Sequence, residues 1–153
     1  MATAVAASCA IPSFFKPVRV NGTRYVDGGV HSPTNADLAA NIDLDLVIVS
    51  SPMSIGRKQV RIAPDQAARR LAGLALSREV TRIRKGGTPV IVFQPTAADL
   101  AAMGPNAMDE SRRADVTRQA RASARHLLIR RDVRDRAALL ATTATRAAAT
   151  PPV

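Results

Sequence analysis

Two short, fully aliphatic runs constrain the fold of this 153-residue chain more than any other feature. Leu46–Val49 reads Leu-Val-Ile-Val and Pro89–Phe93 reads Pro-Val-Ile-Val-Phe. Continuous apolar runs of this length, bounded by turn residues, are typical of strands buried on both faces, as in parallel sheets. Between them, residues 65–85 predict a helix, because apolar residues recur at three and four positions until Gly86-Gly87. The order strand, helix, strand predicts an α/β fold with a mainly parallel sheet flanked by helices.

The first part of the chain predicts a β-hairpin. Val18–Val20 and Arg24–Val26 flank Asn21-Gly22, two residues that tolerate the left-handed conformation of a tight hairpin turn. Further along, Ser32-Pro33-Thr34-Asn35 offers caps for a short helix over residues 36–40.

Further helices are predicted in the second half. Thr96 and Asp99 form a variant of the capping box that opens a helix over residues 97–103, which Gly104-Pro105 ends. Residues 109–129 predict a longer amphipathic helix, and 132–149 a weaker one that merges into a frayed tail over 141–153. We therefore expect a folded part over 1–129 and a weakly helical to disordered, basic tail over 130–153.

The formal net charge of +10 is concentrated in the second part of the chain. Residues 66–153 hold 16 of the 22 Lys and Arg residues but only 7 of the 12 Asp and Glu residues. Most of these arginines fall on predicted helices, so we expect solvated helix faces; weak attraction to an anionic membrane surface is the alternative. Nucleic acid is a less suitable partner, because aromatic side chains for base stacking make up only 3% of the chain.

Neither a leader segment nor a bound metal is predicted. Residues 2–11 are apolar, but no Lys or Arg precedes them, so they predict an Ala-rich helical turn in which Cys9 is a small buried residue. We expect a cytoplasmic protein, with peripheral attachment to a membrane as the alternative. The two histidines and the single cysteine show no metal-ligand spacing, so no metal and no cofactor are predicted.

The triplet Asp27-Gly28-Gly29 is the candidate site. An aspartate at the end of a strand, followed by two residues free to take positive φ, is expected to be held out on a tight turn. In isolation such a turn is more often structural than catalytic. The sequence contains no phosphate-binding Gly-rich motif and no G-x-S-x-G nucleophile motif.

The surroundings of this triplet resemble the patatin-like phospholipase family. The family's pattern is a small-residue helix, Pro, an aromatic residue, Pro-Val, a Gly-containing hairpin, Tyr-Val-Asp-Gly-Gly-Val, a Pro-Ala helix and an aliphatic strand. Here these are Ala7–Pro12, Phe14-Phe15, Pro17-Val18, Asn21-Gly22, Tyr25–Val30, Pro33 with Ala36, and Leu46–Val49. A looser resemblance continues through Pro95–Asp99 and Met103–Asp109, so the pattern extends over roughly residues 1–125.

The resemblance implies a serine acyl hydrolase that acts on acyl ester lipids through a Ser–Asp dyad. Asp27 is implied as the proton acceptor of the dyad, with Gly28 and Gly29 supporting the motif. In the family, the G-x-S-x-G motif and an oxyanion loop precede the Asp-Gly-Gly motif, and this sequence contains neither. Residues 1–129 are therefore expected to be the C-terminal portion of a three-layer patatin-like domain, truncated, without its N-terminal half and inactive alone.

Two partners follow from that expectation. Strands that have lost their neighbours expose unpaired edges, so we expect a complementing N-terminal half or an oligomer. The competing hypothesis is a non-catalytic basic module that binds an anionic membrane surface or nucleic acid. The Asp27-Gly28-Gly29 context favours the hydrolase, whereas only the arginine excess favours the basic module.

Overall fold

The computed structural model of the chain describes residues 1–56, 67–106 and 109–148. It divides into two compact units, Met1–Asn35 (unit 1) and Ala36–Val153 (unit 2). The predicted division into residues 1–129 and a basic tail over 130–153 is a separate question and stays a prediction. The predicted class is confirmed, because helices combine with two small sheets, one of them parallel.

Unit 1 consists of a short helix, a hairpin and one turn of 3-10 helix. In chain order these are α1 (Ala2–Ser8), β1 (Val18–Val20), β2 (Thr23–Tyr25) and η1 (Gly28–Val30). The strands pair antiparallel, with Val18 opposite Tyr25 and Val20 opposite Thr23. Asn21 and Gly22 form the turn with φ of 48° and 81°, so the predicted hairpin is confirmed with its second strand one residue earlier.

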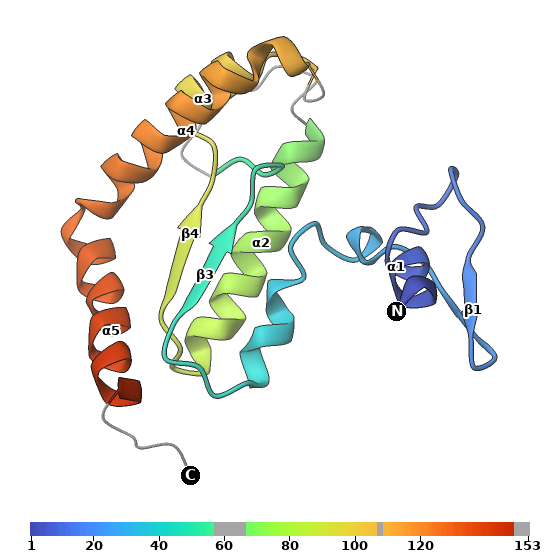
Figure 1. The fold of residues 1–153 in the computed structure, drawn as a ribbon, viewed down its shortest axis with the longest axis horizontal. Coiled ribbons are helices and arrows are strands. Elements are labelled where there is room, and N and C mark those ends of the chain that lie inside the picture. Colours follow the sequence, from blue (N-terminus) through green and yellow to red (C-terminus); the bar gives the residue numbers. More distant parts are fainter. Residues whose placement is uncertain (57–66, 107–108, 149–153) are drawn as a thin grey trace. The chain divides into compact units, whose positions relative to one another are not determined.

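Unit 2 is built around a parallel strand pair and the helix that connects it (Figure 1). Its elements are η2 (Ala36–Asn41), β3 (Val47–Ser50), α2 (Ala67–Lys85), β4 (Val90–Phe93), α3 (Ala97–Met103), η4 (Glu110–Arg112), α4 (Arg113–Leu128) and α5 (Arg131–Ala148). Val47 lies opposite Val90, and the pairing runs in step to Ser50 opposite Phe93. The predicted strand–helix–strand order is confirmed; residues 57–66, which include the first two residues of the predicted helix over 65–85, lie outside the described residues.

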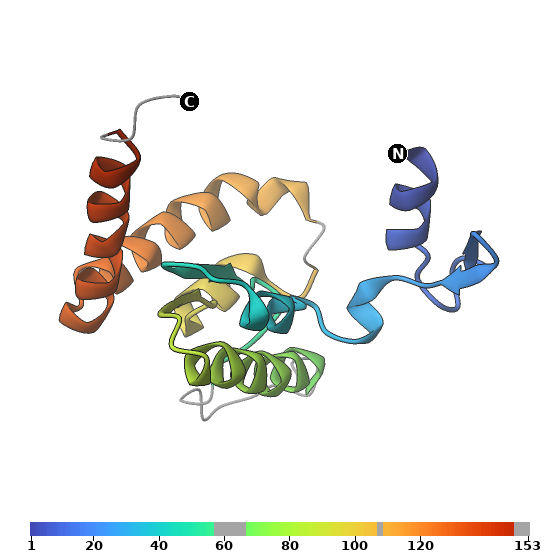
Figure 2. The ribbon, with the colours of Figure 1, turned by 90° about the horizontal axis from the view of Figure 1, so that it is seen from below.

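The hydrophobic core of unit 2 lies between α2 and the strand pair. Figure 2 shows α2 lying along one side of the two strands. Its buried members come from all three elements: Val49, Leu76, Val80, Ile83 and Val90. Ile83 and Val90 are 0% exposed. Alternation along β3 turns Ile48 to the opposite side, where it is 52% exposed. The expectation that this run is buried on both faces is therefore wrong.

Helix ends in unit 2 follow local sequence signals. Gly87, with φ of 91°, ends α2. Thr96 and Asp99 form a complete capping box at the start of α3, and Gly104 follows the helix with φ of 66°. These predicted boundaries are confirmed, because each depends only on residues next to one another in the chain.

Gly73 has a role that the sequence did not indicate. A Cβ atom on this residue of α2 would lie 2.0 Å from the carbonyl oxygen of Ile55. The amide of Ile55 donates to the carbonyl of Arg69 at 3.0 Å, which holds the segment after β3 against the helix. Glycine is needed here because two stretches of backbone touch.

The C-terminal part is more helical than expected. The predicted helix over 109–129 is present as η4 followed by α4. The weaker helix is α5, which runs from Arg131 to Ala148, so the predicted frayed tail is helical over 141–148. Its alanines and arginines are strong helix formers, which accounts for the extension. Residues 149–153 of the predicted tail lie outside the described residues.

Candidate functional site

Asp27 is positioned by its backbone. Its amide donates to the carbonyl of Ala10 at 3.0 Å, which ties the end of the hairpin to the segment after α1. Ala10 is 1% exposed, so this hydrogen bond lies in the most protected part of unit 1. The chain therefore enters the Asp27 turn from a defined direction.

The Asp27 carboxylate folds back onto its own turn. Its Oδ1 atom accepts the amide of Gly29 at 2.7 Å and so caps η1. Among the described residues, the Oδ2 atom makes no hydrogen bond and no cation pairs with the carboxylate. The side chain is half-buried, with one oxygen held and the other left to accept a proton donor.

Gly28 and Gly29 support the turn for a different reason from the one predicted. Neither takes a positive φ, so the expectation that they supply left-handed conformations is wrong. A Cβ atom on Gly29 would lie 3.0 Å from Asp27 Oδ1, and one on Gly28 would lie 3.3 Å from Asn35 Nδ2. Glycine lets the carboxylate and an amide side chain approach the backbone closely, because a side chain at either position would require that neighbour to shift by a few tenths of an ångström.

Ser32 and Asn35 form an outer layer of support that the sequence reasoning missed. Asn35 donates from Nδ2 to the carbonyl of Gly28 at 3.1 Å and to that of Ser32 at 2.7 Å. Ser32 is 2% exposed, and its Oγ accepts the amides of Thr34 and Asn35. The sequence Ser-Pro-Thr-Asn predicts helix caps, whereas in the structure the Ser32 and Asn35 side chains make hydrogen bonds within the turn that follows η1 and to the carbonyl of Gly28.

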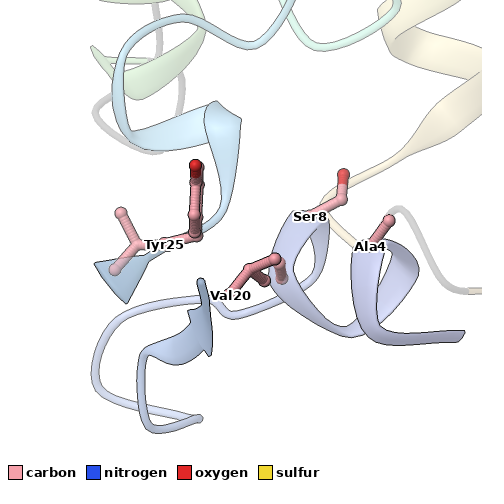
Figure 3. A pocket seen from close by; sticks show the side chains of 6 residues that line it. Ala4, Ser8, Val20 and Tyr25 are labelled. Atoms are coloured by element: carbon pink, nitrogen blue, oxygen red, sulfur yellow. The ribbon is translucent and has the colours of Figure 1, made fainter. Parts of the chain in front are cut away.

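A mainly apolar pocket of about 340 Å³ lies between α1 and the hairpin (Figure 3). It is lined by Ala4, Ala7, Ser8, Val20, Tyr25 and Val26. Figure 3 shows Val20 of the hairpin pointing towards α1, with Tyr25 beside it. The volume is at the small end of the range for ligand sites. Because Asp27 directly follows the lining residue Val26, the candidate carboxylate lies one residue along the chain from the pocket.

Other sequence expectations have simpler outcomes. Cys9 is exposed, so the expectation that it is buried is wrong; the short helix α1 ends before it and does not cover it. Within residues 1–56, 67–106 and 109–148, no three His, Cys, Asp or Glu side chains gather as they would around a metal ion. Over the same ranges, no helix has both the length and the apolarity needed to cross a membrane.

Five arginines of unit 2 have an acidic partner among the described residues: Arg82 lies 3.8 Å from Asp37, and four others pair with acids nearby in the chain. Each of four pairs joins residues two or three apart: Arg112–Asp109, Arg113–Glu110, Arg118–Asp115 and Arg130–Asp132. Most of the paired side chains are exposed, so these helix faces are solvated, while the remaining arginines keep this half of the chain basic. Burial, and then the charge of Arg136, lower the pKa of Arg84; both guanidinium groups donate to the carbonyl of Val90. The membrane and nucleic-acid alternatives for this half remain predictions.

Comparison with known proteins places the resemblance in the part of the chain that carries Asp27. Residues 1–40 match a family model described as patatin-like phospholipase. The match does not extend to the looser pattern that the sequence suggested through residue 125. Searches of curated proteins and of solved structures give no match. The segment that contains the hairpin, the pocket and the Asp27 turn is therefore similar to patatin-like phospholipases, a family of lipid hydrolases.

Proposed function

We propose that Asp27 is the general base of a patatin-type hydrolase of acyl ester lipids, acting on a serine that this sequence does not supply. The observation that carries the proposal is that only one of the two carboxylate oxygens of Asp27 is hydrogen-bonded within the turn. Oδ1 is held by the Gly29 amide at 2.7 Å, while Oδ2 has no partner among the described residues. A base held in this way needs little reorientation before it accepts a proton.

The proposed reaction assigns one task to each neighbouring group. Asp27 accepts the proton of the attacking serine hydroxyl and returns it to the leaving alcohol. Gly29 fixes the orientation of the carboxylate, and Asn35 holds the carbonyl of Gly28 so that the turn keeps its shape. The apolar pocket beside Val26 takes an alkyl part of the substrate. No cofactor enters this scheme.

The test is hydrolysis of a p-nitrophenyl ester by the chain alone and by the chain mixed with a polypeptide that carries a patatin-type oxyanion loop and G-x-S-x-G. We expect no turnover by the chain alone, because no G-x-S-x-G is present to supply a nucleophile. We expect turnover by the mixture, and Asp27→Asn should lower it by about 10²–10⁴-fold, the usual contribution of a general base.

Asp43→Asn is the matched control, since Asp43 is an exposed carboxylate outside unit 1. It should leave turnover unchanged. Turnover that survives Asp27→Asn, in the mixture or in the chain alone, would contradict the assignment of Asp27 as the base.

A further inference from the structure

Unit 1 has two exposed phenylalanines and three exposed cations on its hairpin and on the loop before it, none of which contributes to the Asp27 turn. We propose that Phe14, Phe15, Lys16, Arg19 and Arg24, here called the FKR surface, bind an anionic lipid bilayer. The inference goes further than the proposed function, which supplies a reason for reaching lipid but assigns no membrane contact. Binding is measured without turnover, so the two proposals succeed or fail separately.

The arginines of the hairpin are an unfavourable pair in the free molecule. Arg19 of β1 lies directly opposite Arg24 of β2, and both are exposed. Side chains directly opposite one another in an antiparallel pair have Cβ atoms about 4.5–5.5 Å apart, and like charges there are destabilising. An external anion that lies between the two guanidinium groups relieves this repulsion.

No acidic side chain within unit 1 neutralises these arginines. Asp27 is the only acidic residue in positions 1–35, and its carboxylate is held in its own turn. Neither Arg19 nor Arg24 has an ion-pair partner among the described residues, whereas five arginines of unit 2 do. The pair faces away from α1, because alternation places Val20 and Tyr25 on the pocket side.

Two phenylalanines are displayed on the loop that leads into this hairpin. Phe14 is 80% exposed and Phe15 is 63% exposed. The loop is ordered by its own backbone, since the amides of both residues donate to the carbonyl of Ile11 at 3.1 and 2.9 Å. Exposed apolar side chains on an ordered turn lose little conformational freedom when they are buried.

An anionic bilayer fits this combination better than a soluble anion. Phosphate groups of lipids complement Lys16 and the Arg19–Arg24 pair, and each cation near such a surface strengthens attachment. The exposed rings of Phe14 and Phe15 can enter the interfacial region of the same bilayer. A free phosphate ion can pair with the cations, but it provides no apolar environment in which Phe14 and Phe15 could be buried.

The test is flotation of the whole chain with phosphatidylcholine vesicles, with and without about one third phosphatidylserine. We expect binding only to the anionic vesicles, and weaker binding when salt is raised from 0.1 to 0.5 M. The double variant Arg19→Gln with Arg24→Gln should lower the partition coefficient onto anionic vesicles by about 10- to 30-fold. Phe14→Gln with Phe15→Gln should weaken it by about tenfold or more.

Two control pairs match these changes in unit 2. Arg121→Gln with Arg125→Gln removes the same charge from exposed positions of α4, and Leu71→Gln with Ile129→Gln removes apolar side chains that are 68% and 69% exposed. Both pairs should change binding little, and circular dichroism verifies that every variant keeps its helices.

Four results would overturn the proposal. The first two are absence of vesicle binding, and a loss of vesicle binding in the unit 2 controls that equals the loss in the unit 1 variants. The third is binding of inorganic phosphate that is as strong as vesicle binding and is unaffected by the phenylalanine changes. The fourth is self-association through Phe14 and Phe15 without vesicle binding. The last result would mean that a second copy of the chain covers this surface.

Discussion

The two units are organised by different forces. Unit 2 buries long aliphatic side chains between α2 and two parallel strands, whereas the buried apolar residues recorded in unit 1 are two alanines, Ala7 and Ala10. Unit 1 depends instead on turn conformations and on hydrogen bonds around Asp27. Burial of apolar area is the dominant stabilising contribution in folded proteins, so unit 2 is expected to unfold cooperatively and unit 1 to open at low cost. The candidate site thus lies in the less stable unit.

The largest expected effect concerns the core of unit 2. Ile83→Ala removes a side chain that is 0% exposed, and such truncations cost about 2–5 kcal/mol. Urea unfolding followed by far-UV circular dichroism measures the loss. Leu71→Ala on the same helix, where the side chain is 68% exposed, should cost about 0.5 kcal/mol or less. Equal costs for the two variants would show that α2 does not cover the core as described.

A smaller effect is expected from a backbone change in unit 1. Gly22 has φ of 81°, and a Cβ atom there would meet nothing within 4 Å, so Gly22→Ala tests conformation alone. The left-handed conformation costs about 1–2 kcal/mol for an ordinary residue, and amide hydrogen exchange in the hairpin should accelerate accordingly. Gly22→Asn should be milder, because asparagine tolerates this conformation. The urea midpoint of unit 2 should not change; a shift would mean that the units unfold together.

The smallest effect concerns an exposed carboxylate of unit 2. Hydrogen bonds to Asp109 from the hydroxyl and then the amide of Ser111 lower its pKa below the ordinary 3.8. Because the pKa is lower in the folded chain, the stabilisation is present above that ordinary value and is lost as pH falls through the folded pKa. NMR titration should show the pKa of Asp109 rising in Ser111→Ala but not in Thr117→Ala, which leaves this cap intact. An unchanged pKa in Ser111→Ala would remove the proposed cause.

Local signals account for most of what was predictable. The Asn21-Gly22 turn, the Thr96–Asp99 capping box and the two aliphatic runs each involve neighbouring residues, and each was found where the sequence placed it. The hairpin also identified Asp27 as a residue at a strand end. In contrast, the exposure of Ile48 depends on which face of the strand pair a helix covers, which periodicity alone does not reveal.

The sequence alone determined the elements, the α/β class and the Asp-Gly-Gly context that is similar to patatin-like phospholipases. Tertiary structure decided how that context is built: Gly29 allows the close approach of the Asp27 carboxylate, and the Asn35 side chain donates to the carbonyl of Gly28. It also decided that Gly73 must lack a side chain. The physical reason is how far apart in the sequence the interacting residues lie. Propensity, capping and turn conformation arise between neighbours in the chain, whereas packing and close contact arise between segments that only the folded chain brings together.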